Sequence, residues 1–160
     1  MRNKVWQITT KEIDCEYWIT ESTFDDYNIG DFADFVEGIN MTEDDEEEIL
    51  ECIDPLIKGV FKREGRVLTY LGAEDFVNDW LITIKDKVAE LDNHNIKDYM
   101  TLWRVKHLFE DTHLQTDARV WTADSDYGTA EPYGEFIRDV YANAKVGDKF
   151  YIGGIVGFHF

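Results

Sequence analysis

The hydrophobic periodicity of the sequence changes between its ends and its middle, and this change constrains the fold most. Apolar residues repeat at helical spacing over residues 76–91 and 133–141. The clearest repeat consists of Tyr133, Phe136, Ile137, Val140 and Tyr141. Both ends of the chain instead carry runs rich in β-branched and aromatic residues, which are typical of strands. The sequence therefore predicts an α+β fold, with an antiparallel or mixed β-sheet covered by four to five helices.

The first forty residues predict a hairpin followed by a short helix. The runs Val5–Thr10 and Cys15–Thr20 read as two strands, and the polar residues 11–14 between them form the expected turn. A short helix is expected near Asp31–Gly38, where Gly38 would end it. The N-terminal strand is thus expected to pair with the segment that directly follows it.

The stretch NMTEDDEEEILEC, residues 40–52, holds seven carboxylates in thirteen positions and no basic residue. Thr42 is a suitable N-cap, and Ile49, Leu50 and Ile53 give the following helix one apolar stripe. Acids in the first turn are stabilised by the helix dipole, which accounts for residues 43–45 but not for 46–48. Asp54-Pro55 is expected to end this helix and to begin another, with Asp54 as its cap.

The second half alternates strands and helices. RVLTYLG, residues 66–72, predicts a strand, and residues 76–91 a long helix with one apolar face. Asn95 is the candidate cap of a further helix through Phe109, and a strand is expected at 118–122. Pro132 opens the next helix, and KFYIGGIVGFHF predicts a strand in which Gly153-Gly154 is either a bulge or a hairpin turn.

The length of 160 residues indicates one domain, residues 1–160, and its net charge of −18 is unevenly distributed. Residues 1–56 hold 17 acids and 3 bases, a net of −14, whereas residues 57–66 hold 4 bases and 1 acid, a net of +3. This field repels nucleic acids and anionic membranes and attracts basic protein surfaces. With no signal peptide or bilayer-spanning run in view, a cytoplasmic protein with two reduced, half-buried cysteines, Cys15 and Cys52, is expected.

No stretch of the chain carries a persuasive catalytic, cofactor or metal motif. Asp124, Asp126 and Glu135 are spaced like calcium-loop ligands, but the glycine is misplaced, so a polar strand-to-helix loop is the favoured interpretation. Asp111 lies near His113, yet no nucleophile motif accompanies this pair. GGIVG is followed by no helix that could hold a phosphate. The sequence therefore favours a protein that is not an enzyme and carries no cofactor or metal.

In size, charge and aromatic content the chain is similar to acidic anti-restriction and anti-CRISPR proteins of phages and mobile elements. The resemblance implies a nucleic-acid mimic, an inhibitor that fills the basic groove of a DNA- or RNA-binding protein. Its candidate partner-binding surface consists of Asp25, Asp26, Asp31, Asp34, Glu37, Glu43, Asp44, Asp45, Glu46, Glu47, Glu48 and Glu51. The basic residues Lys58, Lys62, Arg63 and Arg66, expected on a helix from Pro55, would offset residues 46–48.

Two alternatives to mimicry remain open. The first is a small enzyme or ligand-binding domain whose pocket is lined by aromatic residues, with Trp6, Trp18, Tyr70, Trp103, Trp121 and Tyr127 as candidates. The second is an interaction module that pairs with another protein through its last strand, if that strand lies at a sheet edge.

Overall fold

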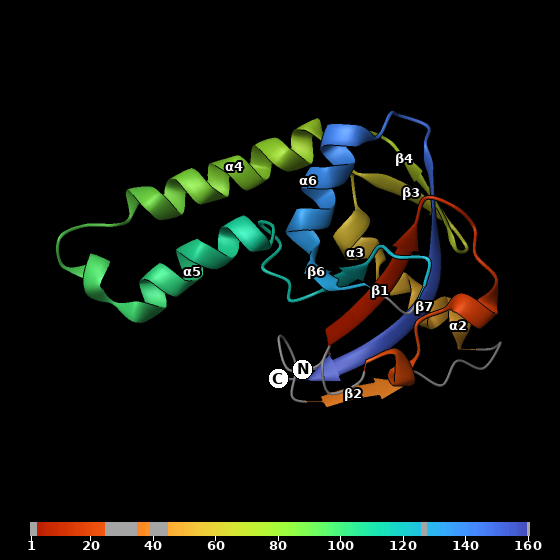
Figure 1. Ribbon diagram of the computed structural model, residues 1–160. Helices are drawn as coiled ribbons and strands as arrows, with labels where there is room; N and C mark the ends of the chain where they lie inside the picture. The colour runs from red at the N-terminus through yellow and green to blue at the C-terminus, as the bar shows by residue number, and fades with distance from the viewer. Residues whose placement is uncertain (1–2, 25–34, 39–44, 126–127, 160) are drawn as a thin grey trace.

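The computed structural model describes residues 3–24, 35–38, 45–125 and 128–159 and shows a mixed seven-stranded sheet with helices packed on it (Figure 1). The strands are β1 (Asn3–Thr9), β2 (Phe35–Gly38), β3 (Phe61–Glu64), β4 (Val67–Tyr70), β5 (Arg119–Trp121), β6 (Ala130–Pro132) and β7 (Lys149–His159). Their order is β3-β4-β7-β1-β5-β6, and β2 also pairs with β7. Among the strand pairs of the described residues, only β1–β5 is parallel. The predicted α+β class is confirmed.

Strand β7 is a central strand of the sheet and pairs with three other strands. It pairs with β1 along one edge, while its other edge pairs with β4 at residues 149–151 and with β2 at residues 156–159. Gly153 and Gly154 lie between the paired positions Ile152 and Ile155, opposite the single residue Gln7 of β1, so they form a bulge. The bulge interpretation is therefore correct, and β7 is an interior strand, which rules out the predicted edge-strand pairing.

Five α-helices lie in the described part of the chain: α2 (Glu46–Glu51), α3 (Asp54–Ile57), α4 (Glu74–Ala89), α5 (Tyr99–Glu110) and α6 (Tyr133–Asn143). The short 3-10 helices η1 (Cys15–Tyr17), η2 (Glu21–Thr23) and η3 (Asn95–Lys97) lie in connections. Of these helices, none combines the length and apolarity needed to cross a bilayer. Asp98, rather than Asn95, caps α5 by accepting a hydrogen bond from the Thr101 amide at 2.9 Å.

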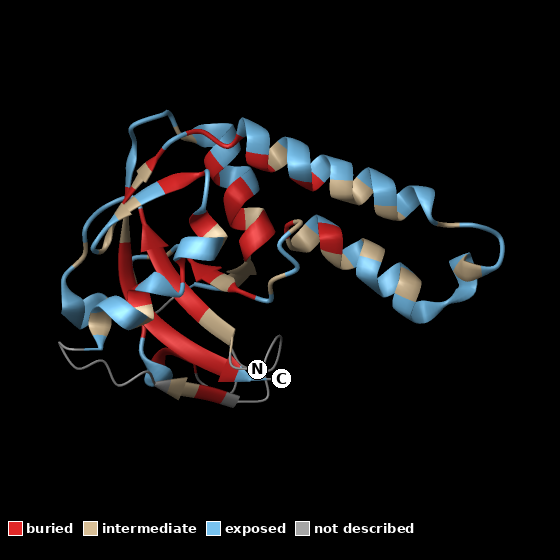
Figure 2. Ribbon diagram, turned by 180° about the vertical axis from the view of Figure 1, so that it is seen from behind, coloured by how far each residue is buried: buried red, intermediate tan, exposed pale blue. Residues whose placement is uncertain are grey.

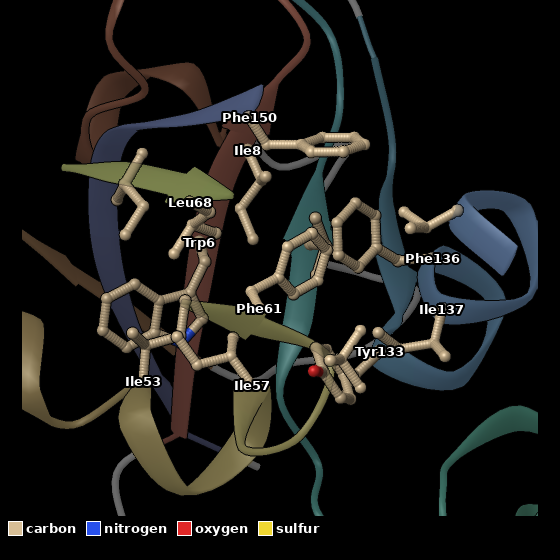
Figure 3. Packing of buried hydrophobic residues seen from close by; sticks show 14 of the residues in the cluster. Trp6, Ile8, Ile53, Ile57, Phe61, Leu68, Tyr133, Phe136, Ile137 and Phe150 are labelled. Carbon is tan, nitrogen blue, oxygen red and sulfur yellow. The ribbon is translucent and has the colours of Figure 1, made fainter. Parts of the chain in front are cut away.

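The sheet carries a hydrophobic cluster on each face. Alternation along β1 sends Trp6 and Ile8 to one face, where α6 supplies Tyr133, Phe136 and Ile137 (Figure 3). Val5 points to the other face, into a smaller cluster that includes Trp121, Val156 and Phe158. The periodicity of residues 133–140 thus predicts the buried face of α6 correctly, although Tyr141 is 44% exposed.

Helices α4 and α5 form an arm that stands away from the sheet (Figures 1 and 2). At its base, Phe76 and Trp80 of α4 and Leu108 of α5 are buried, and the Trp80 indole nitrogen donates a hydrogen bond to the Leu108 carbonyl. Further out, side chains of the predicted apolar face are exposed, including Leu81 and Val88. The predicted long helix is confirmed, and its apolar face is covered except at Leu81 and Val88.

The predicted N-terminal hairpin is wrong in its second strand. Both edges of β1 are already paired, with β5 and β7, so residues 15–20 have no free edge beside β1. They instead form η1 and cross the sheet face, where the buried side chain of Gln7 binds their backbone. Gln7 Oε1 accepts from the Ile19 and Gly154 amides at 2.9 Å each, and its Nε2 donates to the Tyr17 and Ala123 carbonyls at 3.1 Å each.

Two further predictions are corrected. Residues 35–38 of the expected helix at 31–38 form strand β2, because the end of β7 offers them an open edge; residues 31–34 lie outside the described ranges. The helix expected from Pro55 ends at Ile57, and Phe61–Glu64 form β3, which turns through Gly65 (φ 57°) into β4. Lys58 and Lys62 therefore do not share a helix. Cys15 and Cys52 are exposed rather than half-buried.

Candidate functional site

Helix α2 carries the described part of the acidic stretch. Leu50, 2% exposed, and the following Ile53, fully buried, anchor it to the core. Because the helix begins at Glu46, residues 46–48 occupy its first turn, where the positive end of the helix dipole stabilises negative charge. Helix physics therefore does account for these three acids, contrary to the sequence-based expectation. The predicted cap Thr42 lies outside the described residues.

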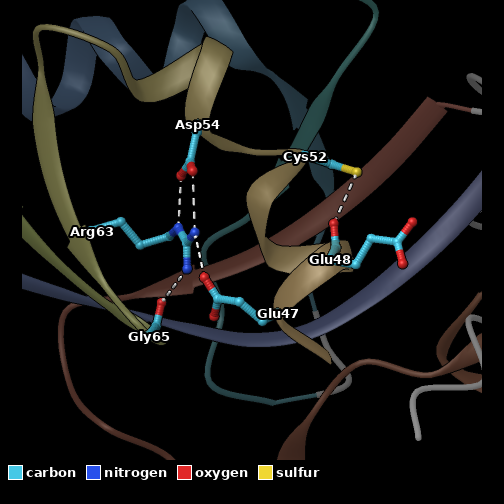
Figure 4. A network of polar contacts seen from close by, with 6 residues as sticks. All are labelled: Glu47, Glu48, Cys52, Asp54, Arg63 and Gly65. Carbon is cyan, nitrogen blue, oxygen red and sulfur yellow. Dashed lines mark hydrogen bonds and ion pairs between the residues drawn. The ribbon is translucent and has the colours of Figure 1, made fainter. Parts of the chain in front are cut away.

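Two acids of the predicted partner-binding surface form ion pairs with the basic island: Glu47 with Arg63, which Figure 4 shows, and Glu46 with Arg66. Arg63, whose side chain is 9% exposed, places Nη2 2.8 Å from Glu47 Oε1 and Nε 2.7 Å from Asp54 Oδ1. These bonds hold the pKa of Arg63 above its ordinary value and that of Asp54 below. Arg66 Nε lies 2.6 Å from Glu46 Oε1. The prediction that basic residues offset α2 is confirmed for Arg63 and Arg66.

Arg66 also joins α2 to a second acidic segment. Its guanidinium lies 4.1 Å from the centroid of the Trp18 ring, and its Nη1 donates to the Gly153 carbonyl at 2.6 Å. Trp18 follows η1 directly, so the connection after β1 lies beside α2. Four exposed acids belong to this connection: Glu12, Asp14, Glu16 and Glu21. Sequence reasoning missed them because the predicted hairpin gave no reason to expect this connection beside α2.

The resulting acidic surface is defined here as Glu12, Asp14, Glu16, Glu21, Glu47, Glu48 and Glu51, all exposed. Within the described ranges, Glu48 and Glu51 have no salt-bridge partner among the basic side chains. Asp45 is the exposed N-cap of α2, while Glu37 lies on β2 opposite Gly157 and is partly buried. The remaining predicted members lie outside the described residues: Asp25, Asp26, Asp31, Asp34, Glu43 and Asp44.

A cavity of about 630 Å³ lies between α6 and the sheet. Phe136, Val140 and Phe150 contribute apolar wall, and Glu131 and Asp139 contribute carboxyl groups. Burial, followed by repulsion from Asp139 and Glu135, raises the pKa of Glu131 above its ordinary value. The cavity therefore combines an apolar wall with a partly desolvated acid.

The aromatic residues predicted to line a pocket do not come together in one. Trp6, Tyr70 and Trp121 are core residues, at most 4% exposed, and Trp121 belongs to the cluster on the opposite sheet face from the other two. Trp18 lies under Arg66, whereas Trp103 is on the distant arm. Tyr127 lies outside the described residues.

A smaller cavity, about 250 Å³, lies at the base of the arm and is lined by Asp111, Asp117 and His107 among others. Burial raises the pKa of Asp111 to about 7, repulsion from Asp117 and Glu110 adds to the effect, and Arg119 opposes it. His107 Nδ1 lies 3.2 Å from Glu110 Oε2 and 4.0 Å from Asp111 Oδ2. A perturbed carboxyl in a cleft is compatible with proton transfer, but no activated nucleophile lies among the lining residues.

The other residues considered for catalysis or metal binding make ordinary packing and ion-pair contacts. The His113 ring packs on Phe76, with centroids 4.6 Å apart. Glu135 lies in the first turn of α6, 3.5 Å from Arg138 Nη2, and Asp126 is outside the described residues. Among the described side chains, no group of three or more His, Cys, Asp or Glu is placed to hold a metal ion.

Comparison of the chain with protein-family models, curated protein sequences and solved structures finds no match.

Proposed function

We propose that this protein is a non-enzymatic inhibitor that binds, through its acidic surface, the basic groove of a DNA- or RNA-binding protein. The observation that carries the proposal is the position of Arg66, which pairs with Glu46 and stacks on Trp18. This contact brings the connection after β1 and helix α2 into one surface. Both segments present exposed carboxylates, among them Glu16 and Glu21 after β1 and Glu48 and Glu51 on α2.

Mimicry needs negative charges that are both dense and held in place. Duplex DNA presents one charge per about 1.7 Å of its axis, and a protein that binds it gains from counterion release. Here Gln7 fixes the backbone around Trp18, and the buried Leu50 fixes α2. The roles within α2 divide accordingly. Glu46 and Glu47 hold the helix on Arg66 and Arg63, while Glu48 and Glu51 are the outward phosphate surrogates.

The proposal is tested by reversing the outward charges and comparing a control with the same net charge. In the test variant, Glu48→Lys is combined with Glu51→Lys. In the control, Asp79→Lys is combined with Asp86→Lys on the exposed surface of α4. Tagged proteins are incubated with lysate at low and high salt, with and without duplex DNA, and captured proteins are identified by mass spectrometry.

We expect the wild-type protein and the control to retain a nucleic-acid-binding protein at low salt, and added duplex DNA to release it. The Glu48/Glu51 variant should lose most of this capture while its circular dichroism spectrum is unchanged. Capture that survives both charge reversals, or that ignores salt and DNA, would show that the acidic surface does not bind in this way.

A second candidate function, binding of a small ligand, is supported by the cavity of about 630 Å³ beside α6. Its aromatic side chains, Phe136, Phe150 and Tyr151, are not those predicted from the sequence. Because Glu131 and Asp139 also line it, an apolar amine is the matching ligand chemistry. Titration with phenethylamine, followed by NMR shifts of the α6 amides, tests this function. Shifts that saturate in wild type and vanish in Glu131→Gln would support it.

A further inference from the structure

The cavity of about 250 Å³ at the base of the arm is lined by side chains of both charges and by apolar groups (Figure 1). Pockets for drug-sized ligands measure about 300–1,000 Å³, so this cavity has room for a smaller molecule. Its lining includes Lys87 of α4, Trp103, Arg104 and Leu108 of α5, and Asp111 and Asp117 of the connection after α5. Neither the acidic surface nor the larger cavity beside α6 includes any of these residues.

The carboxyl group of Asp111 lines this cavity and lacks a hydrogen bond. Its side chain is 16% exposed, and among the described residues no donor forms a hydrogen bond with it. His107 Nδ1 is 4.0 Å from Asp111 Oδ2 and lies closer to Glu110 Oε2, at 3.2 Å. Because a desolvated polar group without a partner is costly, such groups in folded proteins are as a rule satisfied by water or a ligand. The carboxyl of Asp111 therefore lacks a donor that a bound molecule could supply.

The charges around Asp111 favour a cationic donor. Asp117, which also lines the cavity, and Glu110 repel a negative charge on Asp111, whereas Arg119 attracts it. The protonated form of Asp111 is favoured for this reason and by burial. A bound ammonium group would take the place of that proton, since it supplies both a positive charge and hydrogen-bond donors.

The basic end of the cavity lies further toward the tip of the arm. Arg104 precedes Asp111 by seven residues along α5, which corresponds to about 10 Å along the helix axis. The Nζ atom of Lys87 is already 3.0 Å from Glu90 Oε1. Arg104 forms no salt bridge among the described residues, and its charge acts on Asp98 only at a distance. Arg104 is therefore the group available for a carboxylate, which a guanidinium can bind through two parallel hydrogen bonds.

Apolar wall separates the two charged ends. Leu108 lies between Arg104 and Asp111 along α5, and the ring of Trp103 also lines the cavity. Methylene groups are removed from water when they pack on such a wall. An α-amino acid carries its ammonium and carboxylate groups on one carbon atom, so it cannot reach both ends. A longer chain between the two groups can.

We propose that this cavity binds a small zwitterion whose ammonium and carboxylate groups are separated by a short methylene chain, as in an ω-amino acid. The ammonium group binds Asp111, the carboxylate binds Arg104, and the methylene chain lies on Trp103 and Leu108. The cavity is built from other elements than the acidic surface. This proposal and the proposed inhibitory function therefore stand or fall separately.

The binding is tested by NMR titration of the ¹⁵N-labelled protein with 6-aminohexanoate at about pH 8, where Asp111 is ionised. A ligand of this size is expected to bind at about millimolar concentration. The signals of the Trp103 indole N–H and of the Asp111 amide should shift and saturate. The amide of Asp139, in the larger cavity, should not shift. Hexylamine and hexanoate each keep one of the two charged groups and should bind at least about tenfold more weakly.

Two substitutions test the two ends of the cavity. Asp111→Asn should weaken binding of 6-aminohexanoate about tenfold or more. Arg104→Gln should weaken 6-aminohexanoate by a similar factor but leave hexylamine unchanged, because hexylamine has no carboxylate. The control Asp79→Asn removes an exposed carboxylate of α4 outside the cavity and should bind as wild type does.

Four results would overturn the proposal. They are the absence of saturable shifts with 6-aminohexanoate, equal binding of hexylamine or hexanoate, shifts centred on the larger cavity, and binding that survives either Asp111→Asn or Arg104→Gln. Circular dichroism spectra that match the wild-type spectrum would show that a variant which loses binding is still folded.

Discussion

Asp111 at the base of the arm makes the stability of the protein depend on pH in a direction that can be worked out. Its pKa is about 7 in the folded protein and 3.8 as the ordinary value. Between these values the folded state holds a proton that the unfolded state has released. The contribution of the protonated Asp111 to the free energy of unfolding is thus fully present below about pH 4, and it is lost as the pH rises through about 7. We expect Asp111→Asn, which is permanently neutral and of similar shape, to remove this loss.

The magnitude follows from the shift and from the exposure of the carboxyl. A shift of about 3 pKa units corresponds to about 4 kcal/mol if nothing screens the charge. The side chain is 16% exposed and lines a cavity, so solvent screens part of its field, and we expect about 1–2 kcal/mol. At about pH 8 the Asp111→Asn variant should be more stable than wild type by this amount, and near pH 4 the two should be equal.

Urea unfolding of both proteins at several values between about pH 4 and pH 8 measures the difference. Because only the difference between the two curves is used, the other carboxylates of the chain cancel. The comparison is then repeated with His107→Gln in both chains. This shows how much of the difference in stability depends on the His107 imidazole, which lies 4.0 Å from Asp111 Oδ2. Parallel pH profiles for wild type and Asp111→Asn would refute the reasoning, since they would mean that Asp111 titrates alike in both states.

Three further substitutions probe the contacts that build the acidic surface. Gln7→Glu should cost about 3–5 kcal/mol in urea unfolding, because it buries a charge and removes two donated hydrogen bonds; a loss below 1 kcal/mol would contradict its role. Gly154→Ala should lower Tm by several degrees, since an added Cβ collides with the Ile19 carbonyl; an unchanged Tm would mean that this crossing is loose. Arg66→Ala should cost about 1–3 kcal/mol and weaken the salt-sensitive capture, while Trp18 should become more accessible to fluorescence quenchers.

The elements with several periods of one pattern could be predicted from the sequence. Helix α6 repeats its apolar residues over three turns and buries all of them except Tyr141, as the repeat largely predicts. Strands β2 and β3 have four residues each, too few for a pattern to show, and β2 pairs with residues about 120 positions away. In α4 the apolar stripe predicted the helix correctly but not its surroundings, because periodicity shows which face is apolar and not what lies against it.

The acidic surface was predictable only in part, because its two segments meet through contacts between residues far apart in the sequence. The carboxylates of α2 are plain in the sequence, and so is the basic island that balances two of them. The pairing of Arg66 with Glu46 across a hairpin depends on β3, and the contribution of Glu16 and Glu21 depends on both edges of β1 being occupied. Such facts arise from the three-dimensional pairing of strands, which local patterns do not contain.

The position of β7 has a consequence for synthesis on the ribosome. Strands β1, β2 and β4 all pair with residues 149–159. The centre of the sheet therefore cannot form until these residues have been synthesised. At 5–20 residues per second, the first strand waits for about 7–30 s with its edges open, a state prone to aggregation. The net charge of −14 over residues 1–56 makes nascent chains repel one another during this interval. The acidity of the first third thus protects the unfinished protein as well as shaping the finished one.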